Sequence, residues 1–155
     1  MVAIVCFFIV AAFTIELYWL IFHSSLAARS HFDVVAYLFG IYGQGDAAYF
    51  DQVTPLTLGL ESINVFFTQW LHVWLLYAIL RKRPYRFALQ LGVASYVAYS
   101  VVLYFWESYL SGWQYMRSTA PLILALYVAV NLPWLLGNLY VAWHAGVRIT
   151  RRFAG

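Results

Sequence analysis

Residues 61–90 form the segment that most constrains how this chain can fold. The twenty residues from Glu61 to Leu80 contain one carboxylate and five other polar side chains, and the rest are apolar or aromatic. A helix of about 20 such residues is long enough to cross a bilayer. The run ends in the basic turn 81–86, and the next apolar segment begins at once. A carboxylate inside a membrane helix is costly, so Glu61 marks a functional site by default.

The composition requires that lipid, rather than water, covers much of the surface. The 155 residues are 65% hydrophobic and only 10% charged, with a mean hydropathy of +0.76, whereas a soluble domain is about 25% charged. Apolar runs predict four spanning helices, over residues 2–22, 56–80, 87–106 and 121–145. We therefore expect an all-α integral membrane protein with a single domain over 1–155.

The first apolar segment has a second interpretation, a cleaved signal peptide with the small residues 24–28 as its cleavage site. A signal peptide begins with a positive region and has a short apolar core. No Lys or Arg precedes Arg29, and Glu16 lies inside the segment. We therefore interpret residues 2–22 as a membrane span.

The distribution of basic residues predicts the orientation in the membrane. Seven of the nine Lys and Arg residues lie in the 81–86 turn or after residue 147. By the positive-inside rule, both regions face the cytoplasm. With four spans, both termini then lie on the cytoplasmic side, and the loops 23–55 and 107–119 lie on the other side. Within the first loop, the apolar residues 32–42 could form a short helix in the membrane interface.

Two carboxylates are predicted at one depth in neighbouring helices. Glu16 lies about seven residues before the outer end of its span, and Glu61 lies about six residues after the outer end of the next. At 1.5 Å per residue, both are about 8–10 Å below the outer boundary. Two carboxyl groups that face one cavity do not readily ionise together. The pair could offer one protonated acid and one ionised base, as acid–base catalysis requires.

Helical periodicity adds polar and aromatic side chains to the same cavity. A helix has 3.6 residues per turn, so each span carries one such stripe on an otherwise apolar surface. We therefore expect a four-transmembrane-helix bundle with an inward-facing ligand pocket, which has polar groups at one end and aromatic walls. The stripes are Glu16, Trp19 and His23 in the first span; Glu61, Asn64, Thr68 and His72 in the second; Tyr96, Tyr99 and Ser100 in the third; and Tyr127, Asn131, Trp134 and Asn138 in the fourth.

Simpler roles are open for several of these residues. Asn138 and Thr68 could provide hydrogen bonds between helices. His72 lies some 16 Å along its helix from Glu61, which favours a structural or interfacial role. The histidines lie at different depths without ligand spacing, so we expect neither a metal site nor another cofactor. The single Cys6 rules out an internal disulfide, and nothing indicates binding to nucleic acid.

Five motifs, spread over most of the chain, form a recognisable set. They are IELYW in the first span, GQGDAAYF over 43–50, GLESINVFFTQWLHVWLLYAILRKRPYRFALQL in the second and third, YxxxLYF over 99–105 and Asn131-x-x-Trp134. Together they resemble the emopamil-binding protein family, the EXPERA domain of sterol isomerases and their relatives. The resemblance implies a four-helix fold in the membrane of the endoplasmic reticulum, with a pocket for a sterol-like ligand.

The resemblance also implies a chemistry. In the isomerase branch an intramembrane acid protonates a ring double bond, and a base then removes a proton from a carbon beside the carbocation. By position, Glu16 and Glu61 match the two family glutamates. Asn131 and Trp134 match the pair on the last helix, where the Trp face can shelter a cation. Asn64 stands where the sterol isomerases have a threonine.

The main departure from the family pattern is Ala12. The isomerases have a histidine at this place, one turn before the first glutamate, as part of the proton-donating pair. Glu16 alone could still act as the acid. Alternatively, the substrate could be more reactive than an unactivated alkene, such as an epoxide, a dienone or an isoprenoid side chain that is isomerised or cyclised.

The sequence thus predicts a cofactor-independent membrane isomerase, similar to sterol Δ8–Δ7 isomerases, that acts on a sterol or terpenoid-like lipid. The alternative is a non-catalytic protein that binds or transports sterols or cationic amphiphiles. A purely structural subunit would leave the buried acids without a purpose. The family further implies a homodimer. The expected catalytic residues are Glu16, Glu61, Asn64 and Asn131, and the expected substrate-binding residues are Trp134, Trp19, Tyr99, Tyr127 and Thr68.

Overall fold

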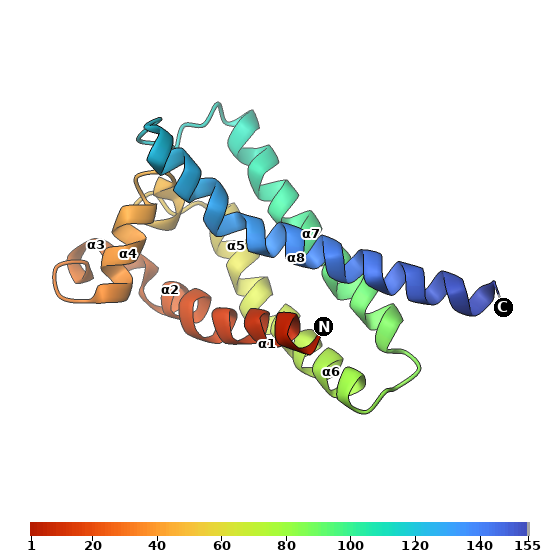
Figure 1. Cartoon of the computed structure of the whole chain (residues 1–155). Helices are drawn as coiled ribbons and strands as arrows, with labels where there is room; N and C mark the ends of the chain where they lie inside the picture. The colour runs from red at the N-terminus through yellow and green to blue at the C-terminus, as the bar shows by residue number, and fades with distance from the viewer. Residues whose placement is uncertain (155) are drawn as a thin grey trace.

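The computed structural model describes residues 1–154 and confirms the predicted all-helical class. These residues form helices and turns without a β-strand. Four helical segments within this range are long and apolar enough to cross a membrane (Figure 1). They are Val2–Arg29, Pro55–Leu80, Arg86–Leu110 and Pro121–Phe153.

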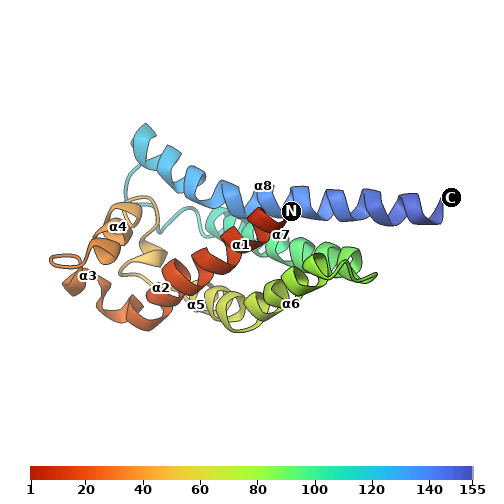
Figure 2. The same cartoon turned by 60° about the horizontal axis from the view of Figure 1, so that its bottom comes forward.

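The four segments pack in two pairs. α7 (Arg86–Leu110) lies along α8 (Pro121–Phe153), and α1 (Val2–Ala11) packs against α6 (Gln69–Leu80). Toward the N-terminal end of α8, this helix diverges from the first segment, and α4 (Val34–Tyr42) lies between them (Figure 2). The divergence leaves room for a cavity between the pairs.

The first two segments are each interrupted by a π-helical turn. In the first, α1 leads into the π-helical turn Ala12–Glu16, which is followed by α2 (Leu17–Phe22). In the second, α5 (Pro55–Ile63) leads into the π-helical turn Asn64–Thr68 and then α6. The two turns contact each other. Single π-turns inside α-helices are rare and occur mostly at functional sites.

Two helices extend past the ends that the sequence predicts. The sequence places residues 107–119 in a loop, whereas α7 continues for one more turn. Ser108 in this turn is buried, and its hydroxyl donates to the Tyr104 carbonyl (3.1 Å). α8 likewise continues past residue 145, and its last turn carries Arg151 and Arg152. Cations there interact favourably with the helix dipole.

The segment before α5 is largely folded. His23–Ser25 forms a 3₁₀ turn, and α3 (Leu26–Arg29) and α4 follow. Asp33 begins α4, because its carboxylate accepts hydrogen bonds from the amides of Val35 (2.9 Å) and Ala36 (3.3 Å). The short helix expected within residues 32–42 is therefore present.

The connection after α4 is tied to the loop between α7 and α8. It contains the 3₁₀ turn Ala47–Tyr49. The Ala47 amide donates to the Tyr115 carbonyl (2.9 Å), and Arg117 forms an ion pair with Asp51. These bonds hold Tyr49 and its neighbours over the end of the helical bundle.

Gly43, at the end of α4, offers a test of this packing. A Cβ atom on Gly43 would lie 2.5 Å from the Cβ of Phe50 and 3.1 Å from the Phe39 carbonyl oxygen. We expect Gly43→Ala to lower the free energy of unfolding by about 1–3 kcal/mol. Gly92→Ala in α7 is the matched control, because a Cβ there meets nothing within 4 Å. Thermal unfolding in detergent should show a lower midpoint for the first variant only.

Candidate functional site

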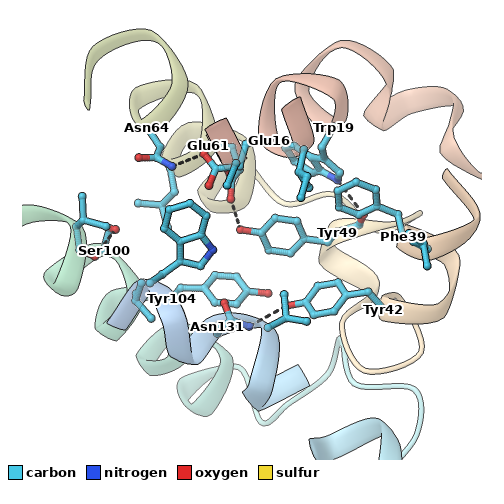
Figure 3. A pocket seen from close by; sticks show the side chains of 18 of the residues that line it. Glu16, Trp19, Phe39, Tyr42, Tyr49, Glu61, Asn64, Ser100, Tyr104 and Asn131 are labelled. Carbon is cyan, nitrogen blue, oxygen red and sulfur yellow. Dashed lines mark hydrogen bonds between the residues drawn. The ribbon is translucent and has the colours of Figure 1, made fainter. Parts of the chain in front are cut away.

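A cavity of about 470 Å³ lies between the helices and under α4 (Figure 3). Its volume falls in the range of small-molecule sites, about 300–1,000 Å³. Its wall is mostly apolar and aromatic, with a few polar groups. It is lined by Phe7, Ala11, Ile15, Glu16, Trp19, Val35, Leu38, Phe39, Tyr42, Tyr49, Leu60, Glu61, Asn64, Val97, Ser100, Val101, Tyr104, Val130, Asn131 and Trp134.

Glu16 and Asn64 join the two interrupted helices inside this cavity. Glu16 is the last residue of its π-helical turn, and Asn64 is the first of the other. The Asn64 side-chain amide donates a hydrogen bond to Oε2 of Glu16. The bond crosses between the segments at the place where the two turns meet. The half-buried Glu16 carboxyl group thereby gains a hydrogen-bond donor from the other helix.

Glu61 receives its donor from outside the spanning segments. The Tyr49 hydroxyl donates to Oε1 of Glu61, whereas Oε2 is buried and has no hydrogen-bond partner among residues 1–154. Tyr49 is held in turn by Trp19, whose indole N–H donates to the Tyr49 carbonyl oxygen (2.8 Å). The structure thus brings Glu61 and Glu16 to one cavity, and one Glu61 oxygen is left free to accept a proton.

Asn131 and Trp134 lie on the α8 side of the cavity. The Asn131 side-chain amide donates to the hydroxyl of Tyr42 (2.9 Å) and to the Tyr127 carbonyl oxygen (2.8 Å). The Trp134 ring stacks on Phe8, with centroids 4.9 Å apart. Both residues line the cavity together with the two glutamates.

A third acid, Asp46, lies behind the tyrosines of the cavity. It is buried and accepts hydrogen bonds from the hydroxyls of Tyr104 and Tyr42 and from the Ala48 amide. Burial raises the pKa of Asp46 to about 6, although these donors oppose the shift. Asp46 therefore orients two of the tyrosines that line the cavity.

Three predicted binding residues lie outside the cavity wall. Tyr99 is 62% exposed on the outer side of α7, because the inward face of that helix runs through Ser100 and Tyr104. Thr68 is buried, and its hydroxyl donates to the Ile63 carbonyl within its own helix (3.3 Å). Tyr127 is buried one layer behind the wall, where its ring stacks on Tyr42.

Sequence reasoning missed three tyrosines and one acid of the site. Tyr104 lies one turn after Ser100, so the helical periodicity of the third span could have indicated that the Tyr104 side chain faces the cavity. Tyr42, Asp46 and Tyr49 lie outside the spans, and periodicity gives no signal for them. Asp46 and Tyr49 belong to the motif GQGDAAYF, whose glycines indicate turns but no contact with the spans.

Known proteins resemble this chain over most of its length. The family model EXPERA (EXPanded EBP superfamily) matches residues 34–145. The 3-beta-hydroxysteroid-Delta(8),Delta(7)-isomerase of Rattus norvegicus is 31% identical over 134 residues, which cover 84% of this chain and 57% of the relative. The protein of the same name from Cavia porcellus is 29% identical over 135 residues, which cover 84% of this chain and 58% of the relative. The chain thus spans less than two thirds of the length of these relatives.

The raised pKa of Asp46 predicts a pH-dependent stability. The folded protein holds this proton more tightly than the unfolded chain, in which the pKa is about 3.9. The neutral carboxyl group therefore stabilises the fold at low pH, and about 3 kcal/mol is lost as the pH rises from about 4 to 6. Asp46→Asn should remove this loss.

Thermal midpoints in detergent between pH 3.5 and 7.5 measure the effect. Asp33→Asn serves as a control of opposite sign. The Tyr18 hydroxyl lowers the pKa of Asp33 by donating to it, so its stabilising contribution disappears only as the pH falls below about 4. Parallel curves for wild type and Asp46→Asn would contradict the prediction.

Proposed function

The chain belongs to the EXPERA family, the expanded EBP superfamily, and from this premise we propose that it is a membrane isomerase of a sterol or terpenoid-like lipid. The observation that carries the proposal is the pair of half-buried glutamates in one largely apolar cavity, each with a hydrogen-bond donor from another segment. A sterol-like body fits the apolar walls, and the carboxyl groups provide the proton chemistry. Relatives named as Delta(8),Delta(7)-isomerases support the reaction class.

In the proposed reaction, the protein gives one proton to the substrate and takes another proton from it. A carboxylic acid gives its proton to one carbon of a double bond, and the other carbon becomes a carbocation. A carboxylate then takes a proton from the adjacent carbon, and the electron pair of that C–H bond forms the shifted double bond. The protein ends with the same number of protons as it began, so neither an oxidant nor a cofactor is consumed.

Glu16 is the acid and Glu61 is the base in this proposal. Asn64 occupies Oε2 of Glu16, so Oε1 is the oxygen left to carry the acidic proton. Glu61 has one oxygen without a partner, which suits the acceptance of a proton. Asn131 orients the substrate, and the face of Trp134 stabilises the carbocation.

Ala12 bears on the reactivity of the substrate. It is fully buried one turn before Glu16 and has no titratable side chain. General acid catalysis then depends on the carboxyl groups alone. A substrate such as an epoxide, a dienone or an isoprenoid chain, which is isomerised or cyclised with a weaker acid, also suits this cavity.

The same observation favours a second candidate, a non-catalytic protein that binds sterols or cationic amphiphiles. An amine placed in the cavity would pair with Glu16 and Glu61 without any reaction. Sterol binding with no product from any sterol or terpenoid tested would favour this candidate over the isomerase.

We also propose a location and orientation. The four candidate spans make the chain a multi-pass membrane protein. The basic turn 81–86 and the basic end of α8 face the cytoplasm, so both termini are cytoplasmic. The membrane is that of the endoplasmic reticulum, and the working form is a homodimer.

Sterol profiling tests the proposed reaction. The chain is expressed in cells that lack their own Δ8–Δ7 isomerase, and their sterols are compared with those of cells that carry an empty vector. We expect Δ7 sterols to reappear. Their absence, with the protein present in the membrane, would refute the Δ8–Δ7 reaction and direct the assay to other lipids.

The two glutamates provide the test of mechanism. Glu16→Gln and Glu61→Gln should each lower turnover of a Δ8 sterol by about 100-fold or more, because an amide neither gives nor takes the proton. Glu107→Gln is the matched control, since Glu107 lies near the end of α7 outside the cavity. Full turnover in both cavity variants would refute the assignment.

A further inference from the structure

A chain of hydrogen bonds leads away from the cavity behind Glu16. Asn64 donates to Glu16 through its side-chain amide, and its Oδ1 accepts a hydrogen bond from Nε2 of Gln69 (3.3 Å). The other end of Gln69, Oε1, is 3.2 Å from Nδ1 of His72. Four side chains thus form one continuous relay, His72–Gln69–Asn64–Glu16.

The π-helical turn makes this relay possible. In a regular α-helix, residues five apart point about 140° away from each other. A π-helix bonds each residue to the fifth one along, so the turn Asn64–Thr68 brings Gln69 onto the face of Asn64. His72 follows Gln69 at the ordinary spacing of three residues. The relay therefore depends on the same turn that carries Asn64 to Glu16.

Gln69 and His72 do not themselves form hydrogen bonds between helices in the part of the chain that the structure describes. Gln69 is completely buried and His72 is 2% exposed, yet the hydrogen bonds that join Gln69 to Asn64 and to His72 stay within the second span. Only the bond from Asn64 to Glu16 crosses to the first span. Buried polar side chains are costly unless they are hydrogen-bonded. Gln69 meets this need by bonding to Asn64 and His72, and His72 by bonding to Gln69.

The carboxyl group sets the direction of every bond in the relay. Once Glu16 has given up its proton, its carboxylate only accepts hydrogen bonds, so Asn64 must present its NH₂ group to it. The Oδ1 of Asn64 then needs a donor, which Gln69 supplies with its own NH₂ group. The Oε1 of Gln69 accepts in turn, so the proton of a neutral His72 ring lies on Nδ1. A flipped Asn64 would place two NH₂ groups against each other.

We propose that Gln69 and His72 are positioning residues for Glu16: through Asn64, they keep a donor on Oε2 and confine the reactive proton to Oε1. The proposal rests on the isomerase function proposed above. Neither side chain lines the cavity, so they act on proton transfer and leave substrate binding unchanged. This is the difference that separates a positioning role from a binding role.

Kinetics on a Δ8 sterol in membranes test the positioning role. His72→Phe keeps a ring against Phe8, whose centroid is 5.6 Å from that of His72, but removes the donor. Gln69→Leu breaks the relay one step closer to Asn64. Each should lower kcat roughly tenfold with KM within twofold, and the double variant should be no slower than either one.

His72→Asn is the rescue variant, because its amide nitrogen can stand where Nδ1 stands. It should restore kcat to within about threefold of wild type. Matched controls are Gln90→Leu and His144→Phe, which remove the same two residue types from α7 and α8, outside the cavity and the relay. They should keep wild-type kcat. If His72→Phe and Gln69→Leu keep wild-type kcat, or raise only KM, the proposal is overturned.

Nitrogen NMR of ¹⁵N-histidine protein in detergent gives a measurement independent of turnover. The signal of His72 is identified by its loss in His72→Asn. We expect a neutral ring with the proton on Nδ1, and a change of this signal in Gln69→Leu but not in Gln90→Leu. A proton on Nε2 in the wild type would overturn the relay. If the wild type has no activity on the sterol, the proposed function fails, and the tautomer alone decides whether the relay exists.

Discussion

The carboxyl groups of Glu16 and Glu61 line a largely apolar cavity between the helices, and their hydrogen bonds join the segments around it. A carboxyl group in an apolar setting needs hydrogen bonds, because an unpaired polar group away from water costs several kcal/mol. For both glutamates, the hydrogen-bond donor lies on another segment of the chain. Asn64 of the second span donates a hydrogen bond to Glu16, and Tyr49, from the segment before that span, donates one to Glu61. The donors therefore fix how the segments must pack.

The two π-helical turns are the local consequence of this packing. Each inserts one extra residue into a helix and changes the phase of all that follows. Glu16 ends one turn, Asn64 begins the other, and the turns contact each other. The irregular backbone thus occurs where the two spans exchange their hydrogen bond. The second turn also brings Gln69 behind Asn64 and so extends the bond into the relay.

The segment between the first two spans completes the cavity. Asp46 holds the hydroxyls of Tyr42 and Tyr104, and Trp19 holds the backbone of Tyr49. The bond of this segment to the Tyr115 carbonyl ties it to the loop before α8. The polar end of the cavity is therefore built jointly by membrane helices and by residues outside them.

The all-helical class, the four apolar helices and a shared depth for Glu16 and Glu61 could be predicted from the sequence. These follow from hydropathy, helix rise and the short basic turn, which are local properties of the chain. The face that each helix turns toward the cavity could not be predicted in full, because it depends on tertiary packing. Thr68 and Tyr99 lie outside the cavity wall, whereas Gln69 is hydrogen-bonded to Asn64 in that wall. The reason is that a π-helical turn and the packing between helices determine which face of each helix is turned inward. The tyrosines that donate hydrogen bonds come from segments that are distant in the sequence. Which of them meets a given carboxyl group depends on tertiary packing, and no local sequence pattern indicates it.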